Sequence, residues 1–377
     1  MKIERIEVIP VRLPLKALLT LPRGPSRTLD EGKRIAVVKV TADDGTVGWG
    51  EAGPSRRWSA ETLESCVSSI RLYLAPVLIG HEVDDIAGLH AKMNRELATG
   101  LDAGQPVAKA ALDIALHDLL CKRRGIPLQK LFRDGPMGSI ALSRLVSAPT
   151  PEEAAAITRA GLAEGYRGFK LKVGADPAKD LAIMRAVLDA ADGAFVWPDA
   201  NQGYTAGQAL AQARAFEAMG ITLFEQPVAA NDFEGLRMLV RATRVKVVLD
   251  EAAMSVEFVA ELARQRLVEG VAVKVNKLGG LYHAERMCRW AREQGVVLLG
   301  SGLMDAPIGF MASSHLFAAH GIDLPVDLNG PQHIAADYLA APIRMQGQTV
   351  PLPDVPGLGI AIDEGKLAQY ALPLSYG

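Results

Sequence analysis

The stretch FKLKVG (residues 169–174) has the apolar pattern of a buried strand, yet it carries two lysines. Lys170 and Lys172 are two residues apart, so on a strand both side chains point to the same face. Two like charges side by side on a buried face are unfavourable. The stretch therefore predicts that side chains of opposite charge, supplied from elsewhere in the chain, lie close to this face.

Short apolar runs alternate with amphipathic helical segments on both sides of this stretch. From about residue 139 onward we count eight apolar runs with seven intervening helical segments; one run is AFVWPDAN (194–201), which is followed by TAGQALAQARAFEAMG (205–220). Strands that alternate with helices in this way are typical of a parallel barrel. We therefore predict an α/β protein with a (β/α)7β barrel of the TIM type over residues 131–340.

The two ends of the chain differ from this repeat. Residues 1–130 begin with alternating, strand-like segments joined by the hairpin sequence DDGT and continue into helical segments, of which SAETLESCVSSIRLYLAPVL opens with Ser59 as a candidate N-cap. Residues 341–377 are rich in proline and irregular. We predict an N-terminal α+β domain, and a C-terminal segment that packs back on it.

Composition and charge exclude several classes of protein. The formal net charge is −2 with acids and bases mixed along the chain, and no basic run indicates nucleic acid binding. No apolar stretch reaches the roughly 18 residues of a membrane span, and the start lacks a signal-peptide core. The three cysteines are odd in number and widely spaced, which indicates ordinary reduced cysteines and not a disulfide framework. We expect a cytoplasmic protein that binds neither nucleic acid nor a membrane.

Polar residues recur at the predicted carboxyl ends of successive strands, 24 to 27 residues apart after Lys172. In a barrel such positions converge at the face where active sites lie. Three neighbouring carboxylates suit a hard divalent cation such as Mg²⁺, and the absence of His and Cys disfavours zinc. Helix capping or salt bridging are the alternative roles for these acids. The residues in step are Asp199, Glu225, Asp250, Lys274, Ser301 and Asp327.

Lys172 and Lys274 flank the three acids on opposite sides of the predicted barrel. We expect a nearby metal and other cations to lower their pKa, so that each could act as a base on one face of a substrate carbon. A proton α to a carboxylate is weakly acidic, and its removal leaves an enediolate that Mg²⁺ stabilises. Alternatively, the lysines only neutralise the acids. A Schiff-base aldolase that uses one of these lysines is another alternative, but it does not explain three carboxylates at the ends of successive strands.

With these features the chain resembles the enolase superfamily, and within it the muconate lactonizing enzyme (muconate cycloisomerase) subgroup of the mandelate racemase/muconate lactonizing enzyme family. The resemblance implies an N-terminal capping domain, a barrel, a C-terminal segment that completes the cap, and Mg²⁺, or Mn²⁺ in its place. It rests on the segments FKLKVG (169–174), PDANQGY (198–204), FEQP (224–227), VLDEA (248–252) and VKVNKLGG (273–280).

Carried over by position, the resemblance implies that Lys172 and Lys274 are the acid–base pair and that Lys170 supplies positive charge. Asn201 and Glu251, which lie beside expected metal ligands, would support them. The implied metal ligands are Asp199, Glu225 and Asp250.

The chain departs from its relatives near strands 7 and 8. The mandelate racemase branch has a His after strand 7, whereas this chain has Asp305 and places His315 in the next helix, where packing explains it better. Dipeptide epimerases carry D-x-D on strand 8, whereas this chain has Asp327 followed by Asn329. The departure on strand 8 weakens the dipeptide interpretation, and we expect Asp305 to line the pocket.

Substrate choice in such proteins comes from two capping-domain loops, which correspond here to residues 20–32 and 51–62. Both loops contain arginines that suit a second anionic group on the substrate, although solvated arginines are the alternative. The candidate substrate-binding residues are Arg23, Arg27, Arg56, Arg57, Trp58, Ser301, Asp305 and Asp327.

The sequence thus predicts a Mg²⁺-dependent isomerase of a small carboxylate, either a cycloisomerase of muconate or a lactone, or a racemase/epimerase of an amino-acid derivative. A β-elimination dehydratase of a hydroxy acid on the same site, or a non-catalytic ligand-binding barrel, are the alternatives. A homo-oligomer is expected because members of the family commonly form dimers to octamers.

Overall fold

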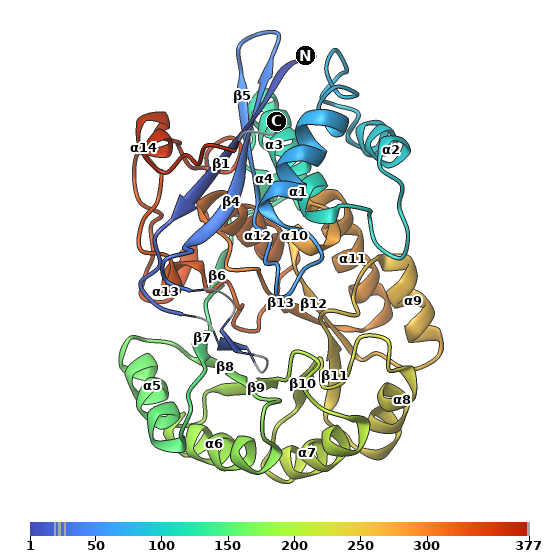
Figure 1. The fold of residues 1–377 in the computed structure, drawn as a ribbon, viewed down its shortest axis with the longest axis vertical. Coiled ribbons are helices and arrows are strands. Elements are labelled where there is room, and N and C mark those ends of the chain that lie inside the picture. Colours follow the sequence, from blue (N-terminus) through green and yellow to red (C-terminus); the bar gives the residue numbers. More distant parts are fainter. Residues whose placement is uncertain (19, 22–23, 26–27, 375–377) are drawn as a thin grey trace.

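The computed structural model describes residues 1–18, 20–21, 24–25 and 28–374 of the 377-residue chain. Figure 1 shows two stacked parts: a strand-and-helix part that contains the N-terminus, and a barrel surrounded by helices. The C-terminal segment runs along the outside of the barrel and returns to the first part. The predicted combination of a capping domain with a parallel barrel is therefore confirmed.

The capping part is built on an antiparallel sheet in the order β1-β4-β5. A tight turn at Gly45 joins β4 to β5, as the DDGT sequence predicted. The strands of this part are β1 (Ile3–Leu13), β2 (Thr20–Leu21), β3 (Gly24–Pro25), β4 (Lys33–Ala42) and β5 (Val47–Ala52). Its helices are α1 (Leu63–Ser68), the π-helix η1 (Ser69–Leu74), α2 (Ile86–Glu96), α3 (Pro106–Arg124) and α4 (Leu128–Phe132).

Helix α3 is the central helix of the cap and lies directly on β5. A β-carbon on Gly50 would come within 1.7 Å of the Ala111 carbonyl oxygen, so only glycine lets the helix approach this closely. The helix ends at Gly125 in a left-handed conformation. The expected N-cap at Ser59 is wrong, because α1 begins three residues later and is capped by the Thr62 side chain.

The barrel consists of seven hydrogen-bonded parallel strands in the order β7 to β13. The helices that follow them lie on the outside (Figure 1). The strands are β7 (Arg144–Val146), β8 (Gly168–Lys172), β9 (Phe195–Asp199), β10 (Leu223–Glu225), β11 (Lys246–Leu249), β12 (Gly270–Val273) and β13 (Val297–Gly300). The helices are α5 (Pro151–Ala163), α6 (Pro177–Ala190), α7 (Ala206–Ala218), α8 (Phe233–Ala242), α9 (Val256–Arg264), α10 (Val275–Leu278), α11 (Leu281–Gln294), α12 (Pro307–Ala319) and α13 (Gly330–His333).

The eighth strand is shorter than its sequence suggested. It contributes two parallel bridges, Val326 to Leu142 and Asp327 to Ser301, which lie between β13 and the first strand and close the ring. Pro325 has no N–H to donate, and this shortens the pairing at its amino end. The predicted first strand is split: Ser139–Ala141 (β6) pairs with the C-terminal strand, and Arg144–Val146 (β7) pairs with β8.

The C-terminal segment joins both parts of the molecule. Its strand β14 (Thr349–Pro351) pairs with β6, and the short helix α14 (Glu364–Gln369) places Glu364 2.6 Å from the Lys39 ammonium of β4. The Leu372 amide donates to the Pro10 carbonyl of β1 at 2.8 Å. These contacts support the three-part division that we propose, with boundaries near residues 130 and 340.

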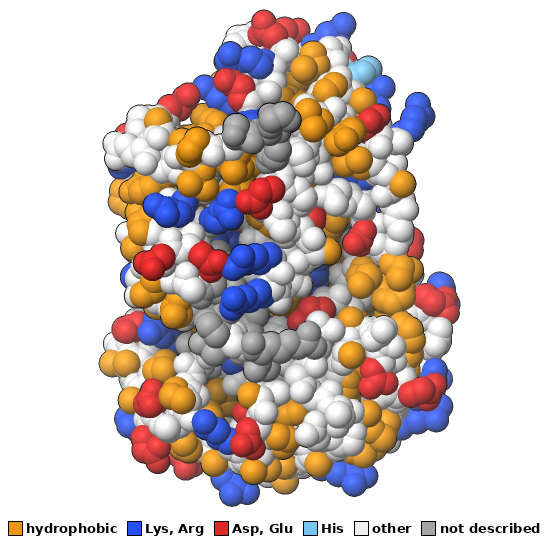
Figure 2. All heavy atoms as spheres, viewed as in Figure 1, with side chains coloured by type: hydrophobic (Ala, Val, Ile, Leu, Met, Phe, Trp, Pro, Cys, Tyr) orange, Lys and Arg blue, Asp and Glu red, His pale blue; other side chains and the backbone are white. Residues whose placement is uncertain are grey.

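The molecular surface carries interspersed charges. On the face in Figure 2, acidic and basic side chains alternate with apolar ones and no single sign covers the face. None of the helices in the described part of the chain is long and apolar enough to cross a membrane.

His315 of α12 connects the barrel to both other parts, as the packing interpretation predicted. Its Nε2 donates to the Leu358 carbonyl at 3.2 Å, and its Nδ1 accepts from the Gln129 amide at 3.2 Å. The ring is therefore neutral and fully buried. Burial lowers the pKa of His315 to about 4.

We predict that His315 makes the protein less stable as the pH falls from about 6.5 to 4. In this range the unfolded chain binds a proton at this position that the folded chain does not, a difference worth up to about 3 kcal/mol. Urea unfolding of the His315→Gln variant should show a weaker dependence on pH than that of the wild type. The matched control is His81→Gln, at an exposed position. An unchanged pH dependence in His315→Gln would contradict the prediction.

Candidate active site

Three carboxylates meet at the carboxyl ends of β9, β10 and β11, as the spacing predicted. Asp199 and Glu225 end their strands, face each other in the parallel register, and are fully buried together with Asp250, which follows β11. One oxygen from each of the three lies within 4.8 Å of the others. The set contains only oxygen donors with net negative charge and could hold a hard divalent cation.

The backbone around these acids is shaped to hold them. Gln226 adopts a positive φ of 35°, and its side-chain oxygen accepts from the Asp250 amide at 2.9 Å. The Trp197 indole donates to Glu225 at 2.9 Å. Left-handed backbone at a non-glycine residue is strained and is concentrated at functional sites. Gln226 and Trp197 were not among the predicted site residues.

Lys170 lies at the centre of the acids. Its Nζ atom is 2.8 Å from Glu225, 2.9 Å from Asp199 and 2.9 Å from Asp327, and its side chain is buried. Asp327 belongs to the short eighth strand, so this one ammonium joins strands on opposite sides of the barrel. The opposite charges that the FKLKVG stretch required are therefore present.

Lys172 lies at the edge of the same cluster and is partly exposed. Its Nζ atom donates to Asp199 at 2.6 Å and to the Asn201 side-chain oxygen at 2.7 Å. The Asn201 amide in turn donates to Glu251 at 3.2 Å. Glu251 is half-buried, and desolvation and the charge of Asp250 raise its pKa to about 7. Asn201 thus links Lys172 to Glu251, whereas support of the metal ligands by these two residues stays a prediction.

Lys274 occupies the opposite side, directly after β12. Its Nζ atom is 2.6 Å from Asp250 and lies 4.1 Å from the ring centre of Trp58, which the capping domain provides. A second lysine, Lys277, donates to the Asp250 carboxylate at 3.1 Å and to the Asp250 backbone carbonyl at 2.5 Å. Lys277 was missed in the sequence, although it lies within VKVNKLGG, one turn after Lys274.

The pKa values of two lysines in the site are raised, not lowered. Burial alone would lower the pKa of Lys170, but the surrounding carboxylates outweigh burial and raise it well above its ordinary value. Asp250 likewise outweighs burial and raises the pKa of Lys274. The expectation of a lowered pKa therefore does not hold for Lys274 in this arrangement, because its ammonium faces the Asp250 carboxylate. Burial and the charge of Asp199 raise the pKa of Glu225 to about 7.

Asp305 is buried between β13 and α12. Its Oδ1 atom accepts from the Asn276 amide at 3.1 Å and from the Leu303 N–H at 3.3 Å. Burial raises its pKa, although Lys33 opposes the shift. Ser301 is also buried and its hydroxyl is 3.5 Å from Asp327. The structure therefore places both residues at the barrel ends where the sequence predicted them.

Glu51 of the capping domain is a buried acid that the sequence analysis missed. Its carboxylate accepts from the Ala306 and Gly309 amides of α12, at 2.7 and 3.2 Å, and from the Tyr338 hydroxyl at 3.0 Å. The available signal was an acidic residue at the end of the otherwise small and apolar strand VGWGEA. Burial and the nearby Asp305 raise the pKa of Glu51 to about 7.

Two of the four candidate arginines lie in the described part of the chain, and both are exposed. Arg56 is exposed and forms an ion pair with Glu31, and Arg57 is exposed as well. Arg23 and Arg27 lie outside the described residues. The role of the arginines in substrate binding stays a prediction.

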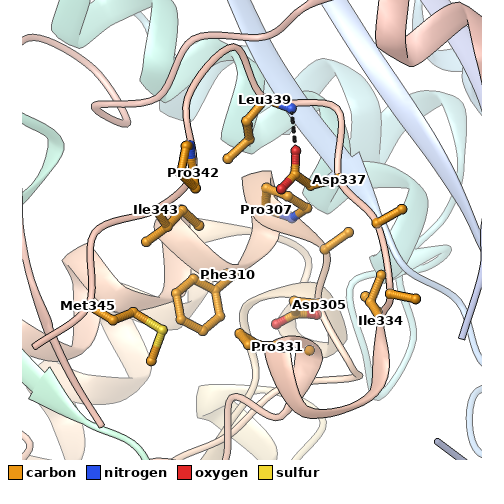
Figure 3. A pocket seen from close by; sticks show the side chains of 14 residues that line it. Asp305, Pro307, Phe310, Pro331, Ile334, Asp337, Leu339, Pro342, Ile343 and Met345 are labelled. Atoms are coloured by element: carbon orange, nitrogen blue, oxygen red, sulfur yellow. Dashed lines mark hydrogen bonds between the residues drawn. The ribbon is translucent and has the colours of Figure 1, made fainter. Parts of the chain in front are cut away.

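An apolar cavity of about 230 Å³ lies next to Asp305, between the first turn of α12 and the C-terminal segment. Figure 3 shows Phe310, Ile334, Ile343 and Met345 around it. A second carboxylate that lines the cavity, that of Asp337, accepts a hydrogen bond from the Leu339 amide at 2.9 Å, as the dashed line marks. The cavity thus borders the site on the side of strands 7 and 8.

Two models of known protein families match the two main parts of the chain, the capping part and the barrel. A family model described as the mandelate racemase/muconate lactonizing enzyme N-terminal domain matches residues 11–132, and one described as enolase C-terminal domain-like matches residues 152–366. The chain belongs to the mandelate racemase/muconate lactonizing enzyme family of the enolase superfamily. The resemblance drawn from the sequence is therefore confirmed.

Individual relatives differ in the reaction that their names state. The chain is 31% identical to a chloromuconate cycloisomerase of Pseudomonas putida, over 98% of this chain and 99% of the relative. It is also 31% identical to an L-Ala-D/L-Glu epimerase of Bacillus subtilis, over 96% and 97%. A crystal structure of a dipeptide epimerase from Enterococcus faecalis with Mg and L-Leu-L-Tyr superposes with a TM-score of 0.88, at 26% identity over 96% and 100%. The protein is an isomerase of this family.

We predict that the three carboxylates bind Mg²⁺ or Mn²⁺ and that Glu225→Gln weakens this binding at least about 100-fold. Loss of a residue that merely supports a ligand already costs about 10- to 100-fold in affinity. Calorimetry with Mg²⁺, and electron paramagnetic resonance with Mn²⁺, would measure the change. The matched control is Glu234→Gln, an exposed acid on α8. Wild-type affinity in a folded Glu225→Gln variant would contradict the prediction.

Proposed function

We propose that the protein is a Mg²⁺-dependent isomerase that removes the proton α to a substrate carboxylate and returns a proton to the resulting enediolate. One observation carries the proposal: three buried carboxylates at consecutive strand ends, with a lysine on the strand before them and another on the strand after them. A purely structural salt-bridge network does not require that order around the barrel.

The donor set fits the proposed ion. All three groups are carboxylates with one oxygen each within 4.8 Å of the others, and burial and the charge of Asp199 raise the pKa of Glu225 to about 7. A bound Mg²⁺ supplies the positive charge that stabilises an enediolate. Mn²⁺, which prefers the same ligands, would serve in its place.

The two lysines would reach the α-carbon from opposite faces. Lys172 ends β8 and Lys274 follows β12, and the three acid-bearing strands lie between them. In the proposed reaction one lysine takes the α-proton through Nζ and the other donates to the opposite face, or the same lysine donates back. Racemisation or epimerisation needs both lysines, whereas cycloisomerisation needs one.

Lys170 has a different proposed role. Its ammonium is buried among Asp199, Glu225 and Asp327, and this environment keeps it protonated. A permanently charged ammonium is a poor base but attracts the substrate carboxylate and the charge of the enediolate. Asn201 orients Lys172 through the 2.7 Å hydrogen bond to its Nζ atom.

The raised pKa of Lys274 sets a condition on this mechanism. The 2.6 Å contact with Asp250 stabilises its charged form. A divalent cation bound to Asp250 would compensate that carboxylate and remove most of the stabilisation. The proposal therefore couples the basicity of the lysines to metal binding.

We predict that each lysine exchanges the α-proton of one configuration of the substrate. In D₂O with Mg²⁺, nuclear magnetic resonance should show α-deuterium entering both enantiomers in the wild type. Lys172→Ala and Lys274→Ala should each lose exchange by at least about 100-fold from opposite enantiomers, the upper end of the usual acid–base contribution being about 10⁴-fold.

The matched control is Lys246→Ala, because Lys246 is exposed at the amino end of β11, away from the site. Wild-type exchange in Lys172→Ala would overturn the assignment. Exchange that depends on one lysine only would favour a cycloisomerase over a racemase.

A further inference from the structure

One buried carboxylate, that of Asp180 on α6, ties the loop after β8 to the loop after β9. Its Oδ2 atom accepts from the Gly174 N–H at 2.8 Å and from the Tyr204 hydroxyl at 2.6 Å. Gly174 lies two residues after Lys172, and Tyr204 lies three residues after Asn201. A single oxygen atom therefore joins the two segments that carry Lys172 and its hydrogen-bond partner Asn201.

Both groups that face this oxygen atom are donors. Burial and the charge of Asp180 raise the pKa of Tyr204, so the hydroxyl keeps its proton and donates. The backbone N–H of Gly174 can only donate, and one carboxylate oxygen has room for two such bonds. The side chains of Asp180 and Tyr204 are only 5% and 4% exposed, so water does not compete for these bonds.

The two loops also touch at their backbones. A β-carbon on Gly203 would lie 2.4 Å from the Gly174 carbonyl oxygen. Asn201 and Gln202, which precede this contact, have left-handed backbones with φ of 41° and 66°. Such backbones are uncommon at residues other than glycine and persist where the surrounding structure holds them. The hydroxyl bond of Tyr204 follows directly and helps to hold this turn.

Packing leaves Lys172 room to move. A cavity of about 410 Å³ lies beside it and is lined by Lys172, Val173 and Asp180 among others. A flexible lysine next to open volume needs hydrogen bonds to fix its position. Its Nζ atom has such a bond to the Asn201 side-chain oxygen at 2.7 Å, and the Asp180 bridge holds together the loops on both sides of that bond.

The bridge lies on one side of the proposed site. It joins the loops after β8 and β9, whereas Lys274 follows β12, and the strands β10 and β11 lie between them. Lys274 is contacted by Asp250 and by Trp58 of the cap. Loss of the bridge is therefore expected to displace Lys172 and to leave Lys274 in place.

We propose that Asp180 and Tyr204 are positioning residues that hold Lys172 against Asn201 for proton transfer on one face of the substrate. This inference rests on the function proposed above and assigns a role to two residues outside the set of metal ligands and lysines. Both act through the loops that they join. Their effect is expected to be large, because misplacing a reacting group by about 1 Å costs about 100-fold in rate.

The test removes the hydroxyl and keeps the ring, which packs against Phe224. α-Deuterium incorporation in D₂O with Mg²⁺ is measured for Tyr204→Phe on both configurations of one probe. The probe is the member of a panel of N-acyl amino acids, dipeptides, proline derivatives and muconolactones that the wild type exchanges fastest. We expect kcat to fall about 10- to 100-fold for the configuration that depends on Lys172 and to stay unchanged for the one that depends on Lys274.

Two further variants assign the effect to the bridge. Asp180→Asn keeps an oxygen atom that can accept both bonds and should exchange both configurations close to the wild-type rate. Asp180→Leu removes the acceptor and should reproduce the one-sided loss.

The matched control is Tyr166→Phe, because Tyr166 is equally buried but precedes the amino end of β8, away from the site. It should leave both configurations unchanged. Calorimetry should show wild-type Mg²⁺ affinity in Tyr204→Phe, since the bridge holds a lysine and not the metal ligands. Circular dichroism and thermal unfolding verify folding, and Tyr204→Phe decides if Asp180→Leu does not fold.

The outcomes separate this inference from the proposed function. Equal losses for both configurations, or a loss of Mg²⁺ affinity in Tyr204→Phe, would indicate a purely structural role and overturn the inference. Wild-type exchange in Tyr204→Phe would overturn it as well. Each of these results leaves α-proton abstraction standing, because the wild type still exchanges the probe. Exchange of no member of the panel by the wild type would overturn both.

Discussion

The buried ammonium of Lys170 is the interaction on which the rest of the site depends. An unpaired charge in a barrel interior would be highly unfavourable, and three carboxylates within 3 Å of this nitrogen compensate it. Those carboxylates come from β9, β10 and the short eighth strand, on both sides of the ring. The arrangement requires the strands to keep their parallel register, since a shift by one residue would turn every side chain to the other face of the sheet.

A second buried charge fixes the cap over the barrel. Glu51 of β5 accepts hydrogen bonds from two amides at the start of α12 and from the Tyr338 hydroxyl. Lys33 of β4 donates to the Leu303 carbonyl at 2.7 Å. The same docking places Trp58 against Lys274, so one face of the site is supplied by the cap. We infer that loops of the cap influence the reaction through this position.

Most of the fold could be predicted because its signals are local and repeated. Alternation of strand and helix at a near-constant spacing indicates a parallel barrel, and the polar residues at successive strand ends follow from the same period. The packing role of His315 was also correctly predicted. The errors occurred where local signals compete: the helix start at Thr62 depended on which hydroxyl faces the first turn, and Pro325 shortened the eighth strand.

The sequence by itself determined the order of the elements, the family, and the set of charged residues that meet at the carboxyl face. It carried a signal for Glu51 and Lys277, an acid at the end of VGWGEA and a second lysine within VKVNKLGG, but it did not show which groups they contact. Only the tertiary structure showed that the Lys274 ammonium faces the Asp250 carboxylate, which raises the pKa of this lysine instead of lowering it. Such properties depend on burial and on distances between side chains, which the three-dimensional arrangement sets and a linear pattern does not encode.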